Sequence, residues 1–134
     1  MAFSGGEVQE ITYNHPTLGS GSFSPKSAEE ATIDRGGKRS NDDANSITAN
    51  GQTIDILNSV RWSFEVMIAV DMNDQDTMQV ITDLAGSTES STWTFTMLNG
   101  VVYRGTGKPV GDVQGSSNAQ MTLKCSGGGV LAKI

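Results

Sequence analysis

The residue types that perform nucleophilic or acid–base chemistry are scarce in this chain. It has one histidine, His15, and one cysteine, Cys125, among 134 residues. His15 precedes Pro16 in a polar stretch typical of a turn, and the sequence has no Gly-x-Ser-x-Gly nucleophile elbow. Cys125 falls on the apolar side of an alternating segment, where a buried, inert thiol is expected. A Ser-His-Asp triad is defined by geometry and stays open at this level, but the pattern favours a protein that is not an enzyme.

Two short motifs resemble ligand sites and depart from the required spacing. The run Gly105–Lys108 is followed by Pro109, whereas a Walker loop needs Gly-x-x-x-x-Gly-Lys-Ser/Thr and a helix after it. Asp71, Asn73 and Asp76 gather oxygen atoms as calcium loops do, but the glycine of the sharp turn is absent. Capping of a following helix explains these three residues better.

Paired carboxylates could serve acid–base chemistry, and the chain has two such pairs. Glu29 and Glu30 form one, and Asp42 and Asp43 form the other. Neither has an aromatic sugar platform nearby in sequence, so both pairs are expected to be solvated or salt-bridged. We therefore expect no catalytic residue, no cofactor and no metal.

The segment Arg61–Asp71 predicts the strand on which the rest of the fold depends. Its side chains alternate with a period of two, as in a half-buried strand. The face expected in the core carries Trp62, Phe64, Val66, Ile68 and Val70. The opposite face carries Ser63, Glu65, Met67 and Ala69.

A helix is predicted directly after this strand, at about residues 73–85. Asn73 can cap it, Asp74 and Asp76 suit its positive end, and Gly86 can close it. Its apolar stripe consists of Met78, Ile81 and Leu84, with Thr77 and Val80 alongside. No other segment has a helical pattern.

The remaining patterns predict further strands joined by turns. Thr92–Met97 alternates with Trp93 and Phe95 on the core face, and Asn99-Gly100 is a strong hairpin signal before Val101–Arg104. Other predicted strands are Glu7–Tyr13, a short one around Ala31 and Ile33, Thr53–Leu57, Ala119–Cys125 and Val130–Ile134. Gly19–Lys26 and Gly105–Gly115 are expected to be connections. We expect a single mainly β domain over residues 1–134, an antiparallel sandwich or barrel of about 7–8 strands with one flanking helix.

The stretch from about residue 35 to 48 differs from the rest, because it is polar, of mixed charge and has almost nothing to bury. It is expected to be a long loop, which in a compact domain is usually functional or disordered. Its charged residues are Arg35, Lys38, Arg39, Asp42 and Asp43.

The composition limits the partners. Fifteen acidic and nine basic residues give a formal charge of −6 and a pI near 4.5, which argues against a general nucleic-acid binder. One cysteine allows no internal disulfide. The sequence has no apolar run long enough to span a membrane and no export leader, so synthesis in the cytosol is expected.

Several blocks together resemble the bacteriophage tail tube (major tail) proteins, a family related to the tubes of type VI secretion and contractile injection systems. The resemblance spans nearly the whole chain and rests on Phe23–Ser27, Asn41–Asn45, Arg61–Glu65, Gly107–Gly115 and Leu123–Gly129. It implies a structural virion protein that self-assembles into stacked, hexameric rings around a hollow channel for DNA ejection. It also implies a location in the virion tail after synthesis in the cytoplasm of a host bacterium. The implied partners are copies of itself and other tail proteins, namely tape measure, terminator, baseplate or sheath, with no membrane.

This resemblance gives the charged stretch and the strand faces an expected role. The polar loop with Arg35, Lys38, Arg39, Asp42 and Asp43 is expected to dock on the next ring. The face with Ser63, Glu65 and Met67 is expected to line the channel, where DNA passes without specific binding; the core is expected to hold Trp62, Phe64, Val66, Ile68, Trp93 and Phe95. Two alternatives stay open, a tube-end or baseplate-proximal protein and a monomeric β-sandwich that binds a ligand.

Overall fold

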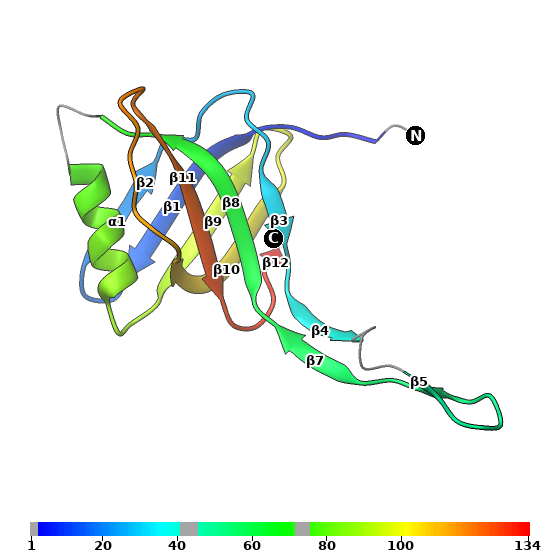
Figure 1. Ribbon diagram of the computed structural model, residues 1–134. Coiled ribbons are helices and arrows are strands. Elements are labelled where there is room, and N and C mark those ends of the chain that lie inside the picture. Colours follow the sequence, from blue (N-terminus) through cyan, green and yellow to red (C-terminus); the bar gives the residue numbers. More distant parts are fainter. Residues whose placement is uncertain (1–2, 41–45, 72–75) are drawn as a thin grey trace.

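The computed structural model describes residues 3–40, 46–71 and 76–134 (Figure 1). It is mainly β, with 53% of residues in strands and one short helix. The strands of the main body are β1 (Val8–His15), β2 (Gly19–Phe23), β3 (Thr32–Asp34), β8 (Trp62–Ala69), β9 (Ser91–Met97), β10 (Val102–Pro109), β11 (Gln120–Gly127) and β12 (Ala132–Lys133). The helix is α1 (Asp76–Gly86).

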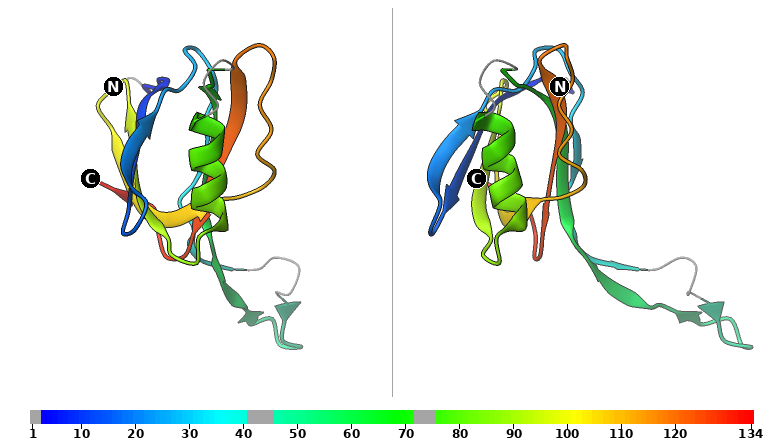
Figure 2. Two further views of the ribbon diagram at one scale, coloured as in Figure 1. Left: turned by 90° about the vertical axis from the view of Figure 1, so that its left-hand side faces the viewer. Right: turned by 60° about the vertical axis from the view of Figure 1, so that its left-hand side comes forward.

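These eight strands form one antiparallel sheet that folds over on itself. Its order is β2-β1-β9-β10-β11-β8-β3, and β12 also pairs with β10. β10 turns the corner, because its first part pairs with β9 and its last two residues, Lys108 and Pro109, pair with β11. The result is the expected antiparallel sandwich or barrel, with β2, β1 and β9 in one layer and β11, β8 and β3 in the other (Figure 2).

Glycines make the close approach at this corner possible. A Cβ atom on Gly107 would lie 2.3 Å from the carbonyl oxygen of Ser126, and one on Gly127 would lie 1.9 Å from that of Thr106. Neither position accepts a side chain without a backbone shift. The run Gly105–Pro109, expected to begin a connection, is therefore part of a strand whose glycines serve packing.

The core lies between the two layers and contains the aromatic residues expected there. Phe64 on β8 stacks on Phe95 on β9 with ring centroids 4.0 Å apart. The indole N–H groups of Trp62 and Trp93 donate to the β10 carbonyls of Thr106 and Gly107, at 3.1 and 3.0 Å. All six residues expected in the core are buried, with at most 2% of each exposed: Trp62, Phe64, Val66, Ile68, Trp93 and Phe95.

The helix stands at one side of the body between the layers (Figure 2). Ile81 and Leu84 are buried in the core, and Met78 and Val80 pack against it, as the apolar stripe predicts. Gly86 is the last helical residue but does not adopt the left-handed conformation of a glycine cap. The expected N-terminal residues Asn73 and Asp74 lie outside the described residues.

The stretch from residue 35 to 48, expected to be a loop, contains strands instead. β4 (Gly37–Ser40) pairs with β7 (Leu57–Val60), and β5 (Ser46–Ile47) pairs with β6 (Thr53–Ile54). Both pairs form a long arm that leaves the body between β3 and β8 (Figures 1 and 2). Polar residues form strands here because partner strands supply backbone hydrogen bonds without any burial of side chains.

Two turn predictions have opposite outcomes. The predicted hairpin at Asn99-Gly100 joins β9 and β10, but only Gly100 has positive φ, at 93°, so the turn is not the type I′ turn that this dipeptide favours. The segment Gly19–Phe23, expected to be a connection, is strand β2 instead, because its serines and glycines pair with β1. In the described part of the chain, no helix is long and apolar enough to cross a membrane.

Candidate functional site

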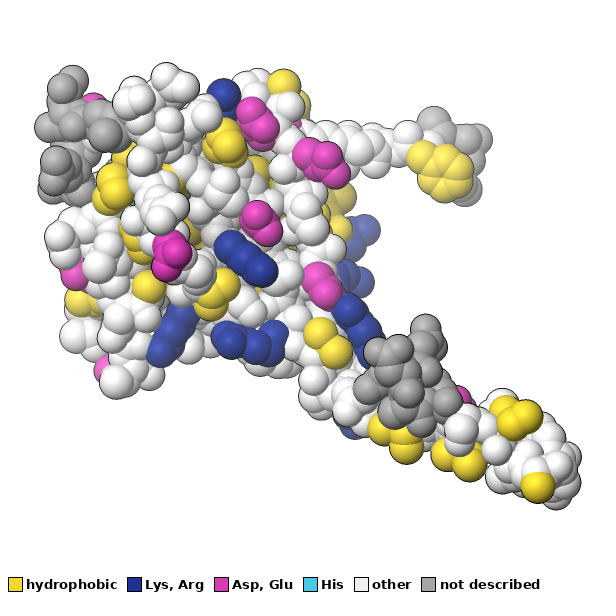
Figure 3. Space-filling view, viewed as in Figure 1, with side chains coloured by type: hydrophobic (Ala, Val, Ile, Leu, Met, Phe, Trp, Pro, Cys, Tyr) yellow, Lys and Arg dark blue, Asp and Glu magenta, His cyan; other side chains and the backbone are white. Residues whose placement is uncertain are grey.

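The described residues of the arm are mostly exposed, and none of them is buried. Four large aliphatic side chains on it are exposed, with Ile47 at 67% and Leu57 at 66%, and Figure 3 shows hydrophobic side chains along its length. Its other two exposed aliphatic residues are Ile54 and Ile56. An isolated two-stranded hairpin is marginally stable in water. An arm of this kind is stabilised when its aliphatic side chains pack against another surface.

The three basic residues of the stretch expected to dock on the next ring, Arg35, Lys38 and Arg39, have different surroundings. Arg39 forms an ion pair with Asp34, with Nη1 3.1 Å from Oδ2. Arg35 Nε donates to the carbonyl oxygen of Leu131 at 2.9 Å, so it ties the start of the arm to the last strand. Among the described residues, no carboxylate lies within salt-bridge distance of Lys38. Of the three, Lys38 is the cation best placed to contact a partner.

The ion pair at the root of the arm also lowers the pKa of the Asp34 carboxyl. The Arg39 guanidinium, and then the backbone N–H of Gly36, lower the pKa of the Asp34 carboxyl below its ordinary value of 3.8. The carboxylate therefore stays charged to a lower pH than an ordinary aspartate does. Asp42 and Asp43, expected to share the docking role, lie outside the described residues.

The side chains expected to line a channel lie on the outer face of β8. Ser63, Glu65 and Met67 are half-buried there between the neighbouring strands β11 and β3. Glu65 is directly opposite Lys124 on β11, so an acidic and a basic side chain share this face. Figure 3, viewed onto β8 and β11, shows several Lys and Arg side chains on this side of the molecule.

The outer face of the other layer is different in chemistry. Thr92, Thr94 and Thr96 on β9 are flanked by Thr12 and Asn14 on β1 in register. Thr92 and Thr94, with residues of β1 and β2 and with Arg104, line a shallow hollow of about 550 Å³. This face is rich in hydroxyl groups and is a wet surface.

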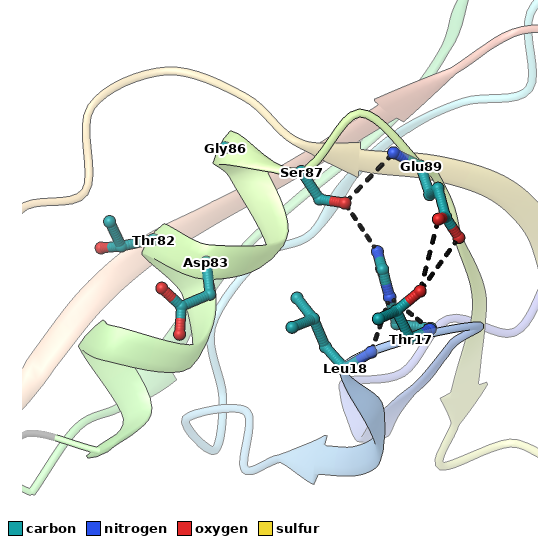
Figure 4. A pocket seen from close by; sticks show the side chains of 8 residues that line it. Thr17, Leu18, Thr82, Asp83, Gly86, Ser87 and Glu89 are labelled. Atoms are coloured by element: carbon teal, nitrogen blue, oxygen red, sulfur yellow. Dashed lines mark hydrogen bonds between the residues drawn. The ribbon is translucent and has the colours of Figure 1, made fainter.

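A second hollow lies between the end of α1 and the turn that joins β1 to β2 (Figure 4). We call it the helix groove. His15, Leu18, Asp83, Ser87 and Glu89 are among its lining residues, and its volume is about 550 Å³. It continues into a recess of about 90 Å³. The recess is lined by Tyr13, Leu18, Val80, Asp83 and Leu84.

His15 holds the wall of this groove in place. Its ring is 2% exposed, and Nδ1 accepts hydrogen bonds from the backbone N–H groups of Thr17 and Leu18, at 3.0 and 2.9 Å. Because Nδ1 must accept, the neutral ring carries its hydrogen on Nε2 and donates it to Ser87 Oγ at 2.9 Å. A histidine that activates a serine must instead accept the serine proton. In this arrangement the His15–Ser87 pair positions a turn.

The other candidate for chemistry is inert in its surroundings. Cys125 is fully buried on β11, and burial raises the pKa of its thiol well above the ordinary value of 9.0. A buried neutral thiol is a poor nucleophile. In the parts of the chain that the structure describes, no cluster of three or more His, Cys, Asp or Glu residues is placed to hold a metal ion.

Sequence reasoning missed both the arm and the helix groove. The Asn50-Gly51 dipeptide predicts a tight turn, and Thr53–Leu57 is the strand expected after it, but the local pattern does not predict the pairing of β4 with β7 and of β5 with β6. No comparable signal exists for the groove, whose two walls are about 70 residues apart in the chain. No protein-family model matches the sequence, and no curated protein is significantly similar to it.

Proposed function

We propose that this protein is a structural subunit that assembles with copies of itself into stacked rings, as the hollow tail tube of a bacteriophage does. The observation that carries the proposal is the arm, a projection built of two successive strand pairs with four exposed aliphatic side chains. A partner that covers these side chains removes apolar surface from water and stabilises the arm. The antiparallel body with one helix supports the same class, because it matches the fold that the resemblance implies.

Repetition of one contact explains why such a subunit forms a tube. A projection on one side of a molecule that binds a different surface of the next copy makes a heterologous contact, and such contacts generate rings or open filaments. Pairing of exposed strand edges between neighbours within a ring would also protect edges such as β2 and β3 from aggregation.

The charge of the chain suits a channel for DNA. With a formal charge of −6, the chain as a whole repels phosphates, and on the face expected to line the channel Lys124 lies directly opposite the acidic Glu65. In this proposal DNA passes through the lumen without specific binding, the tube resides in the virion tail, and its ends meet other tail proteins. The protein has a structural role and no catalytic one.

The proposal is tested by replacement of an aliphatic residue on the arm. Leu57→Asp places a charge on the exposed arm, so we expect the wild type to assemble with rising concentration and the variant to stay monomeric in light scattering and sedimentation. Leu98→Asp is the matched control, since Leu98 is also exposed, at 58%, but lies at the end of β9 on the body. Equal assembly of Leu57→Asp and wild type would contradict the role of the arm in assembly.

The same measurement separates the nearest alternatives. A tube-end or baseplate-proximal protein would form a single ring that does not grow into a filament. A ligand-binding β-sandwich would remain monomeric at all concentrations, with or without Leu57.

A further inference from the structure

The helix groove combines an apolar floor with an acidic rim. Leu18 projects from the β1–β2 turn with half of its surface exposed (Figure 4). Val80 and Leu84 of α1 line the same recess. The recess between them, about 90 Å³, is several times the about 10–15 Å³ that admits one water molecule. It therefore has room for a group of several carbon atoms.

The rim of the groove carries two carboxylates, Asp83 and Glu89. Asp83 Oδ1 accepts from Gln79 Nε2 at 2.9 Å, and Glu89 accepts from the Thr17 hydroxyl at 3.3 Å. Among the described residues, no lysine or arginine forms an ion pair with either. The groove thus offers an apolar recess next to two carboxylates that form no ion pair in the described part of the chain; the nearby Lys108 ammonium donates to the backbone carbonyl of Ser87.

The arm presents the complementary combination on one face. In the register of β4 and β7, Ser40 is opposite Leu57 and Lys38 is opposite Ser59. Directly opposed residues share a face and residues two apart along a strand share it too, so Lys38 and Leu57 lie diagonally on the same face. The exposed side chain of Leu57 and the ammonium group of Lys38 are therefore neighbours on one face of the arm.

The two surfaces lie on opposite sides of the molecule. In Figure 1 the helix is at the left of the body and the arm extends to the lower right. The arm cannot reach the groove of its own chain in this arrangement. A contact between them joins two copies head to tail, which leaves a free arm and a free groove for the next copy.

The geometry points to the helix groove as the receptor for the arm of a second copy, with Leu57 in the recess and Lys38 beside the Asp83 carboxylate. This inference rests on the proposed self-assembly and adds the site at which one subunit receives the next. His15 acts in it as a positioning residue, because its hydrogen bond to the N–H of Leu18 holds one wall of the recess.

A charge exchange tests the pairing. We expect Asp83→Lys and Lys38→Glu each to raise the concentration at which assembly begins by at least about tenfold, because each places like charges together. The double variant Lys38→Glu/Asp83→Lys restores opposite charges and is expected to assemble near the wild-type concentration. Asp112→Lys is the matched control, since Asp112 is an exposed acid that lines neither the groove nor the recess. Circular dichroism checks that each variant is folded, and Asp83→Asn serves in place of Asp83→Lys if that variant is not.

The outcomes separate this inference from the proposed function. Rescue by the double variant supports the contact. Normal assembly of Asp83→Lys, or loss of assembly in the double variant, overturns the groove as the receptor. The proposed self-assembly is unaffected by either result if the wild type forms tubes. A wild type that never assembles overturns the proposed function and this contact with it.

Discussion

The Nε2 atom of His15 lies 2.9 Å from Oγ of Ser87, and this hydrogen bond joins the end of β1 to the residue that follows α1, 72 positions away. Ser87 Oγ also accepts a hydrogen bond from the N–H of Glu89 at 3.1 Å. The backbone carbonyl oxygen of Ser87 accepts one from Lys108 Nζ at 2.5 Å. The sole histidine of the chain thus links the β1–β2 turn, the end of the helix and, through Ser87, strand β10. Its contribution is to the shape of the helix groove.

Replacement of His15 should destabilise the fold by an amount that depends on how many of its hydrogen bonds are lost. His15→Ala removes the acceptor of two backbone N–H groups and the donor to Ser87, so we expect the free energy of unfolding to fall by about 1–3 kcal/mol. His15→Asn should lose less, because its side-chain oxygen can still accept from the turn, and Ser87→Ala tests the remaining bond. Urea unfolding measures all three. An unchanged midpoint in His15→Ala would contradict the role of the ring.

Truncation in the aromatic core should have a larger effect. Phe95→Ala removes a fully buried ring that stacks on Phe64, and the expected loss is about 3–5 kcal/mol of unfolding free energy. Thr94→Ala on the same strand is the control, expected within about 0.5 kcal/mol of wild type. A loss below about 1 kcal/mol in Phe95→Ala would mean that the two layers do not pack as described.

The root of the arm should be sensitive to acid. Because the folded pKa of Asp34 is lowered, its stabilising contribution is present above the ordinary value of 3.8 and is lost as the pH falls through the lower, folded value. Wild type should therefore be more stable than Asp34→Asn at pH 6, and the difference should vanish in strong acid. Thermal melts over a pH series measure this difference. A difference that does not depend on pH would show that the charge of Asp34 is not what matters.

Thiol labelling should report the two sheet faces, since the native cysteine is buried. Cys125 should react with maleimide only on unfolding. In Glu65→Cys, a small maleimide should label both monomers and tubes, whereas a maleimide coupled to a folded protein wider than the channel should label only monomers. That pattern is expected if Ser63, Glu65 and Met67 line the lumen.

The hydroxyl-rich face supplies the comparison for this labelling. Thr94→Cys places a thiol on the outer face of the other layer, where it should react differently from Glu65→Cys in tubes. If Thr94→Cys alone shows the lumen pattern, the channel is lined by β1, β9 and β2, and the assignment of the β8 face is wrong.

The parts of the fold that could be predicted from sequence are those with a strong local pattern. β8 alternates over eight residues with large side chains on one face, and the Asn99-Gly100 turn needs only its own residues to form. β2 and β4 could not be predicted in this way. Their serines, glycines and charged residues become strands because a partner elsewhere in the chain supplies the hydrogen bonds.

The candidate site depends even more on distant partners. The recess is lined by Leu18 and Val80, which come from distant parts of the chain, and His15 is bonded to Ser87, 72 positions away. No short segment of the sequence therefore contains the groove. Periodicity does place the helix stripe and the core aromatics. It cannot place two elements relative to each other.

The most direct test of self-assembly is negative-stain electron microscopy of the purified protein over a concentration series. We expect stacked rings or long hollow filaments with a central channel, and their loss in Leu57→Asp with the body still folded. A protein that stays monomeric at high concentration, with its arm uncovered, would contradict it.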